Sequence, residues 1–124
     1  MKYFCLAYND VGKVGGLSKE EMKAISNACA PYVEDFRRSV SLILVDGLDA
    51  SSSTVLKPGN CETWVSDGPF LETREQIGGV FLFEARDLNG AIRIAAKHPA
   101  ARLHGELGWG VEIRPIARIE AGSV

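Results

Sequence analysis

The spacing of hydrophobic residues predicts a chain that alternates between strands and helices. Four short runs are rich in aliphatic and aromatic residues, as is typical of strands. Between them lie two stretches in which apolar residues recur every three or four positions, as in an amphipathic helix. The strand-like runs cover residues 3–8, 40–45, 80–85 and 110–119.

The first helix is predicted to begin at Ser18, because Ser18 and Glu21 match the S-x-x-E capping box. Pro31 removes a helical hydrogen bond, so we expect a kink, or a junction of two helices, near Ala30. The preceding segment 11–17 holds three glycines and is predicted to be a loop. The apolar stripe of this helix consists of Met22, Ile25, Cys29, Tyr32, Val33 and Phe36.

The second helix is predicted to begin after Asp87, which can cap its first turn, and to end before Pro99. Between the two βαβ units, residues 55–56 and 62–65 are predicted to pair as an inserted hairpin that follows a polar stretch at 51–54. The apolar positions of this helix are Leu88, Ala91, Ile92, Ala95 and Ala96.

This order of elements predicts an α+β fold of the ferredoxin-like class. Two βαβ units of this length most economically form a four-stranded antiparallel sheet with both helices on one face. The other face would expose alternate residues, including aromatics such as Tyr3 or Phe4 and Phe81 or Phe83. Because an exposed apolar sheet face normally marks an interface, we predict a homodimer joined through its sheet faces. A cavity is expected where the sheet meets the long loop that follows the hairpin.

Length, charge and hydropathy restrict the class of protein further. A chain of 124 residues has room for one core, so residues 1–124 are expected to form a single domain. The net charge of −2 argues against a nucleic-acid partner. No apolar run approaches the roughly 20 residues that span a bilayer. The N-terminal run lacks a small-residue cleavage site and is therefore not expected to be a signal peptide.

The cysteines and histidines bear on compartment and cofactors. Three widely spaced cysteines favour reduced thiols in a cytoplasmic protein over a disulfide framework, with Cys5 and Cys29 as small core residues. No CxxC pair exists and there are two histidines, so no metal site is expected. The glycines at 12–16 lack the spacing of a phosphate-binding loop, and no cofactor is predicted.

The segment SDGPFLETREQIGG at 66–79 concentrates charged side chains between two strand-like runs. Asp67 is either a general base or the residue that caps an Asx-turn. Arg74 either clamps a substrate carboxylate or pairs with a neighbouring glutamate. The glycines at 78–79 either permit close approach of a ligand or supply positive φ for the turn into the next strand.

Four further side chains are candidates for the same site. His98 stands at a helix end, where the macrodipole favours a protonated imidazole. His104 is the stronger candidate for pH-dependent chemistry, although a loop histidine is often simply solvated. Tyr8 either points its phenol into the pocket or packs as a core or interface aromatic. Trp109 either forms the floor of an apolar pocket or packs at the interface.

The motif Asp67-Gly68-Pro69-Phe70 and the residues that follow, as far as Gly79, resemble the DGPF signature of the YCII-related proteins. The opening KYFCLAYND, the run ARDLNGAIRIAAKHPAAR and the closing VEIRPI are similar to that family as well, so the resemblance covers about residues 2–118. It implies a ferredoxin-like fold dimerised into an αβ-barrel with a pocket near this loop. Some relatives are fused to sigma-factor-type regulators or encoded near them.

Two functions follow from these residues. The first is a cofactor-independent isomerase or lyase, in which Asp67 acts with His104 or His98 as base and acid. In this hypothesis the substrate is small and polar or carries a carboxylate. The second is a non-catalytic ligand-binding or regulatory dimer that uses the same pocket and is linked to sigma-factor regulation. A third option is a dimerisation module in which the SDGPF loop is purely structural. In the first two hypotheses the ligand-binding residues are expected to be Tyr8, Pro69, Phe70, Arg74 and Trp109.

Overall fold

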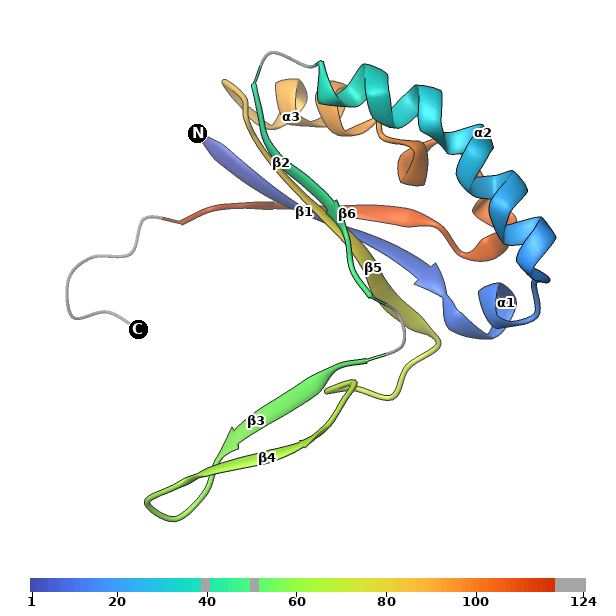
Figure 1. The fold of residues 1–124 in the computed structure, drawn as a ribbon. Helices are drawn as coiled ribbons and strands as arrows, with labels where there is room; N and C mark the ends of the chain where they lie inside the picture. Colours follow the sequence, from blue (N-terminus) through green and yellow to red (C-terminus); the bar gives the residue numbers. More distant parts are fainter. Residues whose placement is uncertain (39–40, 50–51, 118–124) are drawn as a thin grey trace.

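The computed structural model describes residues 1–38, 41–49 and 52–117, which form an α+β fold (Figure 1). The positions Val40, Ser51 and 118–119, which enter the predictions above, lie outside the described residues. The strands are β1 (Lys2–Asp10), β2 (Leu42–Gly47), β3 (Thr54–Pro58), β4 (Thr63–Asp67), β5 (Glu75–Glu84) and β6 (Gly110–Pro115). The helices are α1 (Val11–Gly15), α2 (Lys19–Arg37) and α3 (Leu88–Ala95), with 3-10 turns η1 (Pro99–Ala101) and η2 (Gly105–Leu107).

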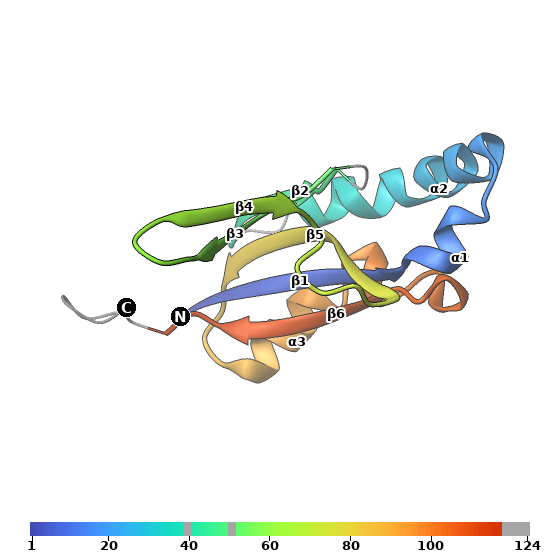
Figure 2. The same ribbon diagram turned by 90° about the horizontal axis from the view of Figure 1, so that it is seen from below.

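The main sheet is four-stranded and antiparallel, as the sequence predicts. Its four strands are arranged β2-β5-β1-β6, and each neighbouring pair is antiparallel. Figure 2 shows β6, β1 and β5 side by side in this order. The order and the antiparallel pairing are compatible with a ferredoxin-like fold. β5 begins at Glu75 and not near Val80, because its first residues continue the pairing with β1 as far as Asp10.

One face of this sheet carries the core. Tyr3 and Cys5 of β1 lie beside Phe81 and Phe83 of β5, and all four are buried in one cluster. Strand residues alternate between faces, so the neighbouring Phe4 stands on the opposite face and is half-buried. The cluster is completed by Phe36 of α2, Val45 of β2, and Ala91 and Ala95 of α3.

The capping box at the start of α2 is confirmed, and of the two outcomes predicted near Ala30 the junction of two helices is wrong. α2 runs through Pro31 as one helix of 19 residues. Pro31 and Asn27, whose carbonyl would accept the missing bond, are both exposed. Water can therefore satisfy that carbonyl, which lowers the cost of the proline.

Two other helical predictions need correction. The segment after β1 is not a loop, because the Asp10 carboxylate accepts hydrogen bonds from the N–H groups of Gly12 and Lys13 and caps α1. Asp87 caps α3 as predicted, at 2.8 Å from Gly90 N. The buried side of α3 is narrower than expected, since Leu88 and Ile92 are exposed.

The capping box gives a first testable prediction. Ser18 Oγ accepts from Glu21 N at 3.1 Å, and Glu21 Oε1 accepts from Ser18 N at 3.0 Å. Ser18→Ala removes the acceptor for the helix N–H group and is expected to lower the free energy of unfolding by about 1 kcal/mol. Ser18→Asp keeps an acceptor and should change it by only a few tenths of a kcal/mol. Urea denaturation of the three proteins makes the comparison, and equal loss in both variants would contradict it.

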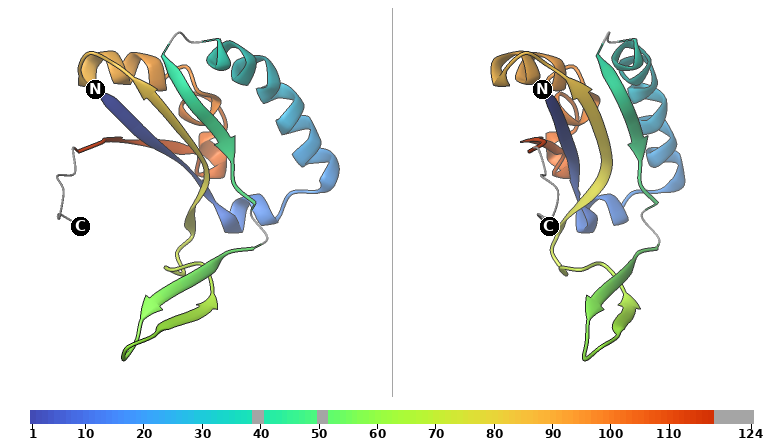
Figure 3. Two further views of the ribbon diagram at one scale, coloured as in Figure 1. Left: turned by 60° about the vertical axis from the view of Figure 1, so that its left-hand side comes forward. Right: turned by 90° about the vertical axis from the view of Figure 1, so that its left-hand side faces the viewer.

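The inserted hairpin is confirmed and forms a separate two-stranded sheet of β3 and β4. We call residues 54–67, which comprise the two strands and their turn, the arm. Figures 1 and 3 show the arm projecting away from the main sheet on the side opposite α2 and α3.

Candidate functional site

A cavity of about 280 Å³ lies between α2 and the ends of three strands of the main sheet. Its wall is mostly apolar, and its volume is close to the lower end of ligand pockets, which usually measure about 300–1,000 Å³. A small organic molecule would therefore fill the cavity. The lining includes His98, Arg37, Trp109, Tyr8 and Cys29.

His98 is held in this wall by contacts with two aromatic rings, which also contact each other. The ring stacks on Phe81 at 4.5 Å between centroids and meets the edge of Phe36 at 5.2 Å. Pro99 ends the helical run, and His98 then caps η1 with its side chain, where Nδ1 accepts from Ala100 N at 3.0 Å. The imidazole is thus fixed in position before any ligand arrives.

Burial lowers the pKa of His98 from 6.5 to about 4, so the ring is neutral at physiological pH. The prediction of a protonated imidazole at a helix end is therefore wrong, because desolvation outweighs the helix dipole. Since Nδ1 accepts a backbone N–H, the proton of the neutral ring resides on Nε2. No described residue bonds Nε2, which leaves this N–H as a donor for a ligand.

Arg37 brings a positive charge to the edge of the same cavity. It is the last residue of α2, one helical turn after Val33 and two after Cys29, and all three line the cavity. Within the described residues, Arg37 has no ion-pair partner. The guanidinium is therefore available to an anionic group.

The other ionisable side chains of the wall point elsewhere or stay neutral. Tyr8 Oη donates to Glu112 Oε1 at 3.1 Å, on the face of the sheet away from the helices. Asp46 alternates with the buried Val45 and so has its side chain on that same face. Burial raises the pKa of the Cys29 thiol, which keeps it protonated.

Trp109 lines the cavity, and the loop before it holds it there. The edge of the Trp109 ring meets the His104 imidazole at 4.9 Å, and His104 Nδ1 lies 2.8 Å from Glu106 Oε1. The hydrogen bond from His104 is the main reason that the pKa of Glu106 lies below its ordinary value. Gly108 has φ +75°, and a Cβ there would come within 2.9 Å of Asp10 N, so the loop requires glycine at this position. His104 itself does not line the cavity.

The DGPF segment borders a separate groove of about 710 Å³, which contains Pro69 and Arg74. Asn9 and Gly78 line both the groove and the cavity, so the two adjoin at the ends of β1 and β5. Gly78 and Gly79 belong to β5, and neither has positive φ, which excludes the turn-forming role considered for them.

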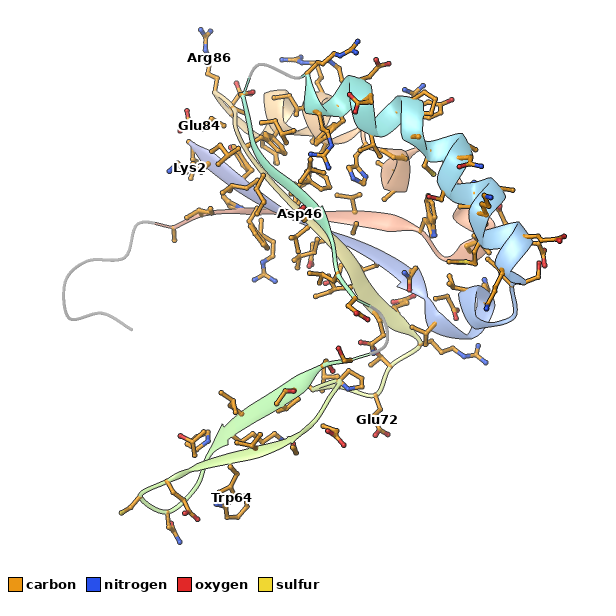
Figure 4. The ribbon with its side chains drawn as sticks, in the orientation of Figure 1. Lys2, Asp46, Trp64, Glu72, Glu84 and Arg86 are labelled. Atoms are coloured by element: carbon orange, nitrogen blue, oxygen red, sulfur yellow. The ribbon has the colours of Figure 1, made fainter. Side chains whose placement is uncertain are left out.

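Asp67 and Phe70 line neither space. Asp67 ends β4 and pairs with Thr54, while Phe70 is 65% exposed, with Lys57 Nζ 4.8 Å from its ring centre. Figure 4 shows the arm, marked by the labelled Trp64, well separated from Asp46 on the main sheet. One chain therefore brings His98 and Trp109 together in the cavity wall, while the Tyr8 phenol bonds Glu112 on the other face of the sheet. Asp67 is not brought to either histidine.

The sequence did not identify Arg37 or Cys29 as parts of a cavity, although it allowed for close approach of a ligand at the glycines 78–79, which line it. The signal for the first two was present, since residues 29, 33 and 37 recur at the four-residue spacing of one helix face. Among the described residues, no group of three His, Cys, Asp or Glu side chains could hold a metal ion. No helix in that part of the chain is long and apolar enough to cross a membrane.

Comparison with known proteins identifies the family of the chain. The model of the YCII-related domain matches residues 1–120, and the chain belongs to this family. It is also similar to a protein of Rhizobium meliloti (strain 1021) that is described as uncharacterized. The two are 31% identical over 128 residues, which cover 100% of this chain and 98% of that protein.

Proposed function

We propose that this protein binds a small, mainly apolar molecule with a carboxylate or similar anionic group in the cavity between α2 and the main sheet. The observation that carries the proposal is the fixed, neutral His98, which presents a free Nε2–H in an apolar wall. Apolar walls with a few placed polar groups are typical of small-molecule sites. Arg37 at the edge supplies the charge for the anionic end.

A proton-transfer enzyme is the second candidate. One observation favours it: a neutral imidazole with a free N–H can polarise a carbonyl group. The reaction also needs a base, and the wall offers no carboxylate side chain in the described residues, since Asp46 stands on the other face of the sheet. Asp67, the base expected from the sequence, would have to come from a second copy. Binding is therefore the function that the geometry supports better.

We further propose that the protein forms a homodimer through the face of the main sheet that the helices leave bare. By register, the apolar side chains of this outer face are Phe4, Leu6, Leu44, Val80 and Leu82. Packed face to face, two such sheets would give the αβ-barrel that the family resemblance implies, with the helices on the outside. The link to sigma-factor regulators stays a prediction from that resemblance.

Isothermal titration of the full chain with small aromatic and branched aliphatic carboxylates, and with their primary amides, tests the binding proposal. The best carboxylate is expected to bind at least about tenfold more tightly than its amide, because a hydrogen bond to a charged group is worth about 1.5–3 kcal/mol. Arg37→Gln should abolish this preference. Arg38→Gln removes the same charge from a residue that does not line the cavity and should leave the preference intact.

Three results would contradict the proposal. They are the absence of binding by any carboxylate, an equal effect of Arg37→Gln and Arg38→Gln, and unchanged affinity in His98→Asn. Incubation of the best ligand with the protein, followed by chromatography, separates the two candidate functions. Conversion that depends on His98 favours the enzyme, and recovery of intact ligand favours the binding protein.

A further inference from the structure

The two faces of the arm differ in what covers them. In the β3–β4 register, Leu56 lies opposite Val65, and directly opposed residues share a face. Lys57 and Trp64 are opposed on the other face, where Lys57 also lies against Phe70. Val55, which shares that second face, is buried at 9% exposure. On this second face Val55 is buried although Trp64 is 61% exposed, whereas the face with Leu56 and Val65 has no buried residue. We call this latter face the bare face.

The centre of the bare face is apolar, between the Thr54–Asp67 and Pro58–Thr63 pairs. Leu56 is 62% exposed and Val65 is 67% exposed, although the two lie directly opposite one another. A two-stranded ribbon alone is at best marginally stable in water. An ordered ribbon with an exposed apolar pair at its centre is expected to be stabilised by another surface.

The same chain carries a second bare apolar surface, the outer face of the main sheet. The apolar side chains at its centre are half-buried, except Leu44, which is 38% exposed. Each of them therefore contributes only a small exposed area to an interface. A stable interface needs about 800 Å² from each partner. Further apolar surface at the margin of the outer face would therefore increase the area buried in a dimer, and the arm carries such surface.

The placement of the arm allows this contact between two copies. The arm leaves the main sheet on the side of the outer face, away from the helices (Figures 1 and 3). A second chain seated on the outer face would therefore lie on the side toward which the arm projects. Within one chain, the arm projects away from the sheet and does not fold over it.

We propose that the bare face of the arm packs against the outer sheet face of a second copy of this chain, so that two copies exchange arms. The interface then has two parts, sheet against sheet at its centre and arm against sheet at its margin. This inference rests on the proposed homodimer and adds the surface that completes it. It gives the Leu56–Val65 pair a partner and assigns the inserted hairpin a role in assembly.

The test is sedimentation equilibrium of the full chain with Leu56→Ser/Val65→Ser. This double variant is expected to raise the dimer dissociation constant by at least about tenfold, because each copy loses two apolar contacts. Leu88→Ser/Ile92→Ser is the matched control, since it removes exposed apolar side chains of 54% and 47% exposure from α3. The control is expected to leave the dissociation constant unchanged.

Hydrogen exchange provides a second measurement that needs no variant. Amides of β3 and β4 should be protected when the protein is dimeric and should exchange faster when it is diluted to monomer. Protection that is independent of concentration would overturn the arm exchange. If Leu82→Lys dissociates the dimer but the arm variant does not, the arm proposal fails while the sheet-face dimer stands. A protein that is monomeric at all concentrations overturns both.

Discussion

Phe81→Ala is expected to lower the free energy of unfolding by about 3–5 kcal/mol, as is usual when a buried aromatic ring is removed. Phe81 is fully buried, meets the edge of Phe36 at 5.0 Å and stacks on His98 at 4.5 Å. It thus joins β5, α2 and the wall of the cavity. A loss of this size is a large part of the 5–15 kcal/mol that typically stabilises a domain.

Phe70→Ala is the matched control, because it removes the same ring from a side chain that is 65% exposed. This change should cost less than about 1 kcal/mol. Urea denaturation at a fixed protein concentration compares the two variants with the native chain. If the two variants lost similar amounts of unfolding free energy, Phe81 would not be a major stabilising residue of the core.

Phe81→Ala should also affect the cavity. Removal of the ring exposes the face of His98 that Phe81 now covers, so water reaches the imidazole more easily. Because burial lowers the pKa of His98, this change should raise it toward its ordinary value. The core and the candidate site are therefore one structure, and a core variant will disturb the site.

Most of the fold could be predicted from the sequence because its elements carry local signals. Runs of aliphatic and aromatic residues predict the strands, and the capping residues Ser18 and Asp87 mark where α2 and α3 begin. The wrong predictions concern segments where the surroundings of a residue outweigh its local preference. Asp10 side-chain bonds make a helix of a glycine-rich segment, and the exposure of Pro31 lets α2 continue.

The candidate site was harder to predict, because its parts are far apart in the sequence. The segment 66–79 is conspicuous for its charges, yet its charged residues do not line the cavity, which the segment reaches only at Gly78 and Gly79. The cavity combines the end of α2, the ends of β1 and β5, and the turn at His98. Only the packing of these elements shows that Arg37 and His98 share one wall.

The protonated state predicted for His98 is wrong for a physical reason. A helix end favours a charged imidazole by roughly 0.3–1 kcal/mol when it is solvated. The position of His98 between Phe81, Phe36 and the start of η1 removes the solvent that this argument assumes. The sequence shows the helix end, but the desolvation depends on residues from three other elements.

The pH dependence of stability provides the second large prediction. The pKa of His98 is about 4 in the folded chain and about 6.5 when the ring is solvated, so between these values the unfolded chain binds more protons. Stability from this group is complete above about pH 6.5 and is lost as the pH falls toward 4. We expect a loss of about 1–2 kcal/mol between roughly pH 7 and 5, after allowance for partial solvent screening.

His98→Asn isolates this contribution. Asparagine can still cap η1 by accepting from Ala100 N, but it does not titrate. Its baseline stability will be lower because the stacked ring is lost, and its stability should change less between pH 7 and 5 than that of the native chain. Glu21 and Glu106 have a pKa below 4.5 and lose their contributions only under more acidic conditions.

A proton NMR titration measures the same quantity directly, since the chain has only two histidines and His98→Asn identifies the signal of one. The His98 resonance should stay unshifted down to about pH 5. A midpoint near 6.5 would contradict both the neutral, Nε2-protonated ring and the role proposed for it in the cavity. The site hypothesis thus depends on a single protonation state, and this state is set by the packing of Phe81 and Phe36.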